Sequence, residues 1–244
     1  MFDYRLYLNE ISSVQINFVR VPGAVKNNSG NAVVLDCDYS VRPDDDGLVV
    51  KWYLNNDQNA VYQWIPPKKP QALGPLKNRL DLSYKITNDP KTAHRALRII
   101  NPTTDIAGEY KCFVSTFSDE DFSSKYMIVF DPEEKLSMFL GVPIDNNVNF
   151  TCLVTGVYPE PKLIMYKNTD EAANFQPKGA MEVVEWTKSR HPNGRYDLSI
   201  VVSAPVDELM PGEIIDCELR IPGTGYVKKK SIIYYPPLER NTSK

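Results

Sequence analysis

The sequence predicts an all-β fold made of two tandem β-sandwiches, and three observations support this fold class. Short runs rich in Val, Ile and Tyr recur about every 8 to 14 residues, separated by clusters of Asn, Asp, Gly and Pro. No segment sustains the apolar spacing of an amphipathic helix. The length of 244 residues suits two domains of about 100 to 130 residues each, and each half carries two of the cysteines.

Two series of strands are expected, one on each side of the segment DPEEK at residues 131–135. In the first domain, residues 14–131, the expected strands are 14–21, 32–39, 48–54, 60–65, 80–86, 93–100, 109–115 and 123–130. In the second domain, residues 132–237, they are 135–142, 147–154, 162–167, 181–187, 196–203, 213–221 and 226–235.

The four cysteines are predicted to form one disulfide in each domain. Cys37, Cys112, Cys152 and Cys217 never occur as a C-x-x-C pair, which argues against zinc ribbons and thioredoxin-type chemistry. Four cysteines can pair in three ways, but two domains in sequence favour Cys37 with Cys112 and Cys152 with Cys217. Such bridges indicate an oxidising compartment.

The first domain carries the core pattern of an immunoglobulin domain of the variable type. Trp52 follows Cys37 on the next expected strand, and strand alternation turns its indole inward against the disulfide. Tyr110 stands two residues before Cys112, at the place of a tyrosine whose hydroxyl closes the corner of the sheet. The segment between Trp52 and residue 80 leaves room for the extra edge strands of a variable-type domain.

The second domain is predicted to be of the constant type, because the segment between its two cysteines is shorter. Two positions differ from the usual pattern. Tyr166 is expected to take the place of the indole in the core, and Ile215 stands where a corner tyrosine would be.

Composition and motifs argue against several classes of function. The chain has 28 Lys and Arg against 31 Asp and Glu, a net charge of −3, so no overall basic field draws it to nucleic acid or an anionic membrane. Its two histidines, His94 and His191, fall in different domains. The sequence motifs of zinc proteases, serine hydrolases and phosphate-binding loops are absent. We therefore expect no enzyme, no metal ion and no cofactor.

Glycosylation sequences favour a secreted or cell-surface protein, although the N-terminus does not resemble a signal peptide. Asn27, Asn149 and Asn241 each begin an N-x-S/T glycosylation sequence. The N-terminal residues lack the apolar core of a signal peptide, and no run of about 18 apolar residues could span a bilayer. We expect an extracellular or cell-surface protein whose leader and membrane attachment lie outside this chain.

Two acidic loops are expected at one end of the first domain. They are PDDDG, with carboxylates at residues 44–46, and SDEDF, with carboxylates at residues 119–121. Six carboxylates could bind a basic partner or a weakly held Ca²⁺ ion. The alternative, which the sequence favours, is that both loops are simply solvated.

The sheet of strands G, F, C and C′ in the first domain is the predicted recognition surface. Because Trp52 and Cys112 point inward, their neighbours along each strand point outward, and exposed aromatic side chains are frequent at binding hot spots. The side chains predicted to bind are Lys51, Tyr53, Tyr62, Trp64, Lys111, Phe113, Phe117 and Phe122. The alternative is that Tyr62 and Trp64 turn inward or are covered by the segment PPKKPQALGP.

Three stretches of the first domain resemble the insect Beaten path family of axon-guidance receptors. They are VRVPGAVKNNSGNAVVLDCDYS, VVKWYLNNDQNAVYQWIPPKKPQ and IAGEYKC, and the likeness covers about residues 18 to 115. V-K-W-Y followed by an aromatic pair that runs into prolines is the most specific part. Ile106 replaces the aspartate usual in variable domains and Asp105 stands one place early, which argues against the common ion pair to Arg79.

The resemblance implies a neuronal or other cell-surface protein that binds an immunoglobulin-superfamily partner similar to the Sidestep receptors and has no catalytic activity. Homophilic binding through the same face is left open. Two alternatives remain: a secreted immune recognition molecule, and an intracellular structural array of immunoglobulin-like domains. Free thiols in the native protein would favour the intracellular array.

Overall fold

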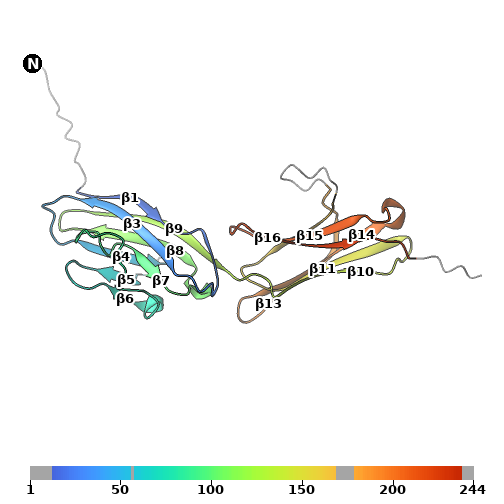
Figure 1. The fold of residues 1–244 in the computed structure, drawn as a ribbon, viewed down its shortest axis with the longest axis horizontal. Helices are drawn as coiled ribbons and strands as arrows, with labels where there is room; N and C mark the ends of the chain where they lie inside the picture. Colours follow the sequence, from blue (N-terminus) through green and yellow to red (C-terminus); the bar gives the residue numbers. More distant parts are fainter. Residues whose placement is uncertain (1–12, 56–57, 169–178, 238–244) are drawn as a thin grey trace, which may run out of the picture. The chain divides into compact units, whose positions relative to one another are not determined.

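A computed structural model describes residues 13–55, 58–168 and 179–237 (Figure 1). The chain divides into two compact units, Met1–Val129 and Phe130–Lys244. Both units are built from strands, with three short 3₁₀ helices among the described residues: η1 (Gly74–Leu76), η2 (Thr104–Ile106) and η3 (Val206–Glu208).

The first unit is a sandwich of two sheets (Figure 1). One sheet has the order β1 (Val14–Arg20), β3 (Val33–Val41) and β7 (Leu97–Ile99). The other has the order β2 (Ala24–Lys26), β9 (Glu120–Phe130), β8 (Gly108–Ser115), β4 (Val49–Leu54), β5 (Tyr62–Trp64) and β6 (Gln71–Ala72). The addition of β5 and β6 beyond β4 is the arrangement of a variable-type immunoglobulin domain.

The core of the first unit follows the predicted pattern. A disulfide joins Cys37 to Cys112 with an S–S distance of 2.07 Å. Trp52 pairs with Cys112 across β4 and β8, and its side chain is fully buried. The Tyr110 hydroxyl donates a hydrogen bond of 2.8 Å to the carbonyl oxygen of Ile106, so it closes the corner of the sheet.

The structure contradicts the expected strand at residues 80–86 and the expected absence of an ion pair to Arg79. The strand expected at residues 80–86 does not form, because the Asp81 carboxylate accepts hydrogen bonds from both the backbone and the hydroxyl of Ser83 and bends the chain there. The ion pair between Arg79 and Asp105 does form, at 2.8 Å. The 3₁₀ helix η2 carries Asp105 within reach of Arg79 although the aspartate stands one place early.

The second unit is also a two-sheet sandwich (Figure 1). Its four-stranded sheet has the order β10 (Lys135–Leu140), β11 (Asn147–Val157), β14 (Tyr196–Pro205) and β13 (Val183–Arg190). Its three-stranded sheet has the order β12 (Lys162–Lys167), β15 (Ile214–Ile221) and β16 (Tyr226–Ile233). Four strands against three is the arrangement of a constant-type immunoglobulin domain.

The core of the second unit corrects the role predicted for Tyr166. The disulfide joins Cys152 to Cys217, and the residue opposite Cys217 on β12 is Met165, whose side chain is buried in the core. Tyr166 lies on the other face of the sheet, where its hydroxyl donates to the Glu218 carboxylate at 3.2 Å. Ile215, by contrast, is fully buried in the core.

Candidate functional site

The outer face of the six-stranded sheet brings together most of the predicted binding residues. Alternation along β9, β8, β4 and β5 turns the side chains between the buried ones outward. We call this surface the outer face and define it by Lys51, Tyr53, Gln63, Lys111, Phe113, Phe122 and Tyr126.

The centre of the outer face is an aromatic group around a lysine. The rings of Tyr53 and Phe113 meet edge to face, with centroids 6.5 Å apart. The Lys111 Nζ atom lies 4.9 Å from the Tyr53 ring centroid and 5.9 Å from that of Phe122. These ring and cation contacts hold the side chains in place before any partner arrives.

The β9 side of the outer face is the most exposed. Phe122 is 64% exposed and Tyr126 is 61% exposed, large values for aromatic side chains. Tyr126 was not among the binding residues predicted from the sequence, although the alternation of inward and outward residues along its strand indicates its position. In SSKYMIVF, Met127 and Val129 are the inward residues, and Tyr126 is therefore outward.

The prediction that Tyr62 and Trp64 point outward is wrong. Tyr62 pairs with Trp52 and Trp64 pairs with Val50, and directly opposed residues of neighbouring strands share a face. Both are only 2% exposed. The Tyr62 hydroxyl donates to the His94 carbonyl at 2.5 Å, and burial raises the pKa of that hydroxyl.

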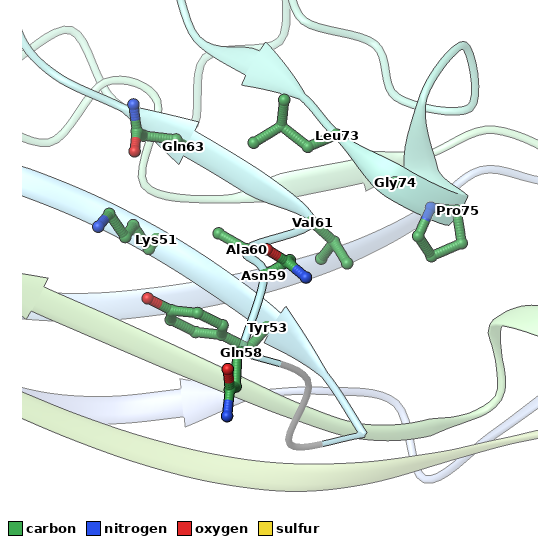
Figure 2. A pocket seen from close by; sticks show the side chains of 10 residues that line it. All are labelled: Lys51, Tyr53, Gln58, Asn59, Ala60, Val61, Gln63, Leu73, Gly74 and Pro75. Atoms are coloured by element: carbon green, nitrogen blue, oxygen red, sulfur yellow. The ribbon is translucent and has the colours of Figure 1, made fainter.

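A hollow of about 390 Å³ opens beside Lys51 and Tyr53 (Figure 2). Its lining combines side chains of β4 and β5 with the segments at residues 58–61 and 73–75. Gln63 of the outer face also lines it, as do the apolar side chains of Leu73 and Pro75. The hollow therefore continues the outer face and could accept a protruding side chain from a partner.

The two acidic loops serve partly to hold the backbone. The Asp119 carboxylate accepts a hydrogen bond of 2.9 Å from the Ser13 N–H, and Asp121 accepts one of 2.7 Å from the Ile16 N–H. In residues 13–55, 58–168 and 179–237, no three His, Cys, Asp or Glu side chains gather as a metal ion would require. Phe117, between the loops, is 86% exposed.

The predicted glycosylation positions differ in exposure. Asn149 is exposed on β11, and Asn27 is partly buried. Asn241 lies outside the described residues. Attachment of glycans at these positions stays a prediction.

Known proteins share the architecture of this chain. The family model of the immunoglobulin domain matches residues 24–124. The first unit thus carries an immunoglobulin domain. The mouse cell surface A33 antigen is 28% identical over 140 residues, which is 54% of this chain. The match spans 43% of the mouse protein's own length.

Solved structures show the same fold over most of the chain. Bovine butyrophilin superposes with a TM-score of 0.62 at 13% identity and covers 87% of this chain and 94% of its own. The extracellular portion of mouse CD200RLa superposes with a TM-score of 0.52 at 11% identity and covers 87% of this chain and 99% of its own. Two tandem immunoglobulin-like sandwiches are therefore the fold of this protein. Among the described residues, no helix is both long and apolar enough to cross a bilayer.

Proposed function

We propose that this chain is an extracellular recognition protein that binds an immunoglobulin-superfamily protein of another cell through the outer face of its first unit. The observation that carries the proposal is the group of four aromatic side chains on the same face of one sheet. Tyr53, Phe113 and Phe122 gather at Lys111, and Tyr126 stands on the same face of β9. Phe122 and Tyr126 are exposed and Tyr53 and Phe113 are half-buried, and an open aromatic group of this size fits a protein interface.

The rigidity of the outer face supports the same proposal. Each outer-face side chain stands on a strand whose inward neighbours are buried in the core, such as Trp52 and Val114. The face therefore loses little conformational entropy when it docks, and more of the contact energy remains for affinity.

The two disulfides and the similarity to the A33 antigen support an extracellular location. A secreted recognition molecule would use the outer face in the same way.

The partner is proposed at two levels of detail. In its broader form, the partner is an immunoglobulin-superfamily surface protein with a sheet complementary to the outer face. A second copy of this chain is one such partner. The resemblance to Beaten path receptors makes a Sidestep-like receptor, and with it a role in axon guidance, the narrower form of the proposal.

The test is a binding screen of the whole chain against immunoglobulin-superfamily ectodomains and against itself, followed by Tyr53→Ala and Phe113→Ala. Each substitution should weaken the partner found by about 2 kcal/mol, or about 30-fold, because hot-spot aromatics lose energy of this order. Phe139→Ala is the matched control, since Phe139 is 53% exposed but lies in the second unit.

Unchanged affinity in both variants, measured by surface plasmon resonance, would contradict the proposed face. If Phe117→Ala weakened partner binding while Tyr53→Ala and Phe113→Ala did not, the partner would bind the loops at the end of the first unit and not the outer face. A circular dichroism spectrum and an unfolding midpoint for each variant separate lost binding from lost folding.

A further inference from the structure

A second candidate site in the first unit is a basic groove away from the outer face. It consists of two hollows of about 480 and 510 Å³ that share the side chains of Lys69, Lys85 and His94. Lys68 and Lys91 line the first hollow as well. We call these two hollows together the basic groove.

The lysines of the basic groove are short of negative partners. No Asp or Glu is among the described residues that line either hollow. Within the described part of the chain, Lys68, Lys69 and Lys85 are exposed and make no ion pair, although the chain as a whole carries a net charge of −3.

The carboxylates nearest along the chain are directed elsewhere. Asp81 accepts hydrogen bonds from Ser83 and from Arg98, the latter at 2.7 Å. Asp89 accepts the backbone N–H of Lys91 at 2.6 Å, within its own turn. Among the described residues, neither of these carboxylates forms an ion pair with Lys68, Lys69 or Lys85.

The walls of the basic groove are built rigidly. The Trp64 Nε1–H donates to the carbonyl of Lys68 at 3.1 Å and fixes the turn that carries Lys68 and Lys69. His94 Nδ1 lies 2.9 Å from the carbonyl oxygen of Tyr84, and since a carbonyl only accepts, Nδ1 carries the proton. Lys91 Nζ donates to the Pro43 carbonyl at 2.9 Å, so this lysine holds the wall itself.

We propose that the basic groove binds a sulfated glycan chain. Unpaired, exposed ammonium groups over two adjoining hollows match a polymer with repeated sulfate charges, whose binding draws on counterion release. An acidic protein segment fits less well, because hot spots of protein interfaces are enriched in aromatic anchors and Trp64 is only 2% exposed here. The extracellular location proposed above places sulfated glycans within reach, and the groove lies apart from Tyr53 and Phe113.

The experiment measures binding of the whole chain to heparin. Fluorescence anisotropy of labelled heparin, or light scattering, monitors the titration. Heparin should bind, and the affinity should fall about tenfold or more between about 50 and about 300 mM salt. The triple variant Lys68→Gln, Lys69→Gln, Lys85→Gln should bind about tenfold more weakly at low salt. Lys91 is left in place because it holds the wall.

A matched control separates the groove from general charge. The control variant is Lys26→Gln, Lys77→Gln, Lys125→Gln, which removes the same charge from exposed lysines that line neither hollow. Its affinity should stay within about twofold of the unmodified chain. Equal loss in both triple variants would overturn the proposal, as would no binding of heparin.

Two further ligands test the class of polymer. Chemically desulfated heparin should bind much more weakly, and equal binding would overturn the role of sulfate. Polyglutamate should also bind weakly, and affinity equal to that of heparin would assign the groove to an acidic protein segment instead. Tyr53→Ala should leave heparin binding unchanged, so failure of this proposal is distinguishable from failure of the recognition face.

Discussion

Replacement of Arg95 by methionine should strongly destabilise the first unit. The Arg95 guanidinium lies between two aspartates of β3. Its Nε atom is 2.9 Å from Asp36 Oδ1, and its Nη1 atom forms an ion pair with Asp38 Oδ1. The side chains of Arg95 and Asp36 are only 12% and 7% exposed. Without the guanidinium the Asp36 carboxylate stays buried with no counter-charge, and the loss should be about 3–5 kcal/mol of unfolding free energy.

Urea unfolding followed by tryptophan fluorescence measures this loss in the first unit. Trp52 and Trp64 are buried there and will change emission on unfolding, whereas Trp186 of the second unit is already 66% exposed. Arg79→Met is the control, because Arg79 and Asp105 are 36% and 56% exposed and water screens their ion pair. That variant should lose about 0–1 kcal/mol.

The double variant Asp36→Asn, Arg95→Met tests whether the unpaired Asp36 carboxylate causes the loss of stability. It removes the buried charge together with its partner, so it should be more stable than Arg95→Met alone. An unfolding free energy of Arg95→Met no lower than that of Arg79→Met would show that water reaches the Asp36 carboxylate in the folded state, and would refute the predicted effect of burial.

Two more predictions concern the second unit. Met165→Ala should cost about 2–5 kcal/mol in calorimetric unfolding, whereas Tyr166→Phe, which removes one hydroxyl from the outer side of the sheet, should cost about 1 kcal/mol. Burial alone would raise the pKa of Glu218, but hydrogen bonds and charge from Arg220 and Lys229 outweigh it and lower that pKa below its ordinary value of 4.5. The stability advantage over Glu218→Gln should therefore be present above about pH 4.5 and shrink as the pH falls, in chemical denaturation at several pH values.

Sequence alone predicted the sandwiches because their cores depend on a few spaced residues. Trp52 and Cys112 stand opposite each other in register, and the Tyr110 hydroxyl reaches back four residues along its own segment. The second relation is local. In the first, alternation along each strand separately turns Trp52 and Cys112 toward the core, so each residue could be assigned from its own segment.

The errors about which side chains face outward arose where register between strands decides the face. Tyr62 lies opposite Trp52, and the sequence does not state which residue of β5 faces which residue of β4. In the second unit the error was a single position, since Met165 rather than Tyr166 faces Cys217. A slip of one residue moves every side chain of a strand to the other face, so strand periodicity without register cannot assign a face.

The acidic loops show why charge in a sequence does not translate directly into a binding surface. Asp119 and Asp121 each accept backbone N–H groups at the start of β1, and Asp45 accepts the N–H of Arg42 at 3.1 Å. Carboxylates that satisfy backbone donors would leave those donors unpaired if they turned to a partner. Lys111 of the outer face carries no such duty, because in the part of the chain that the structure describes its Nζ atom lies over the rings of Tyr53 and Phe122. Specific attraction of a partner is therefore expected to depend more on the sheet than on these loops.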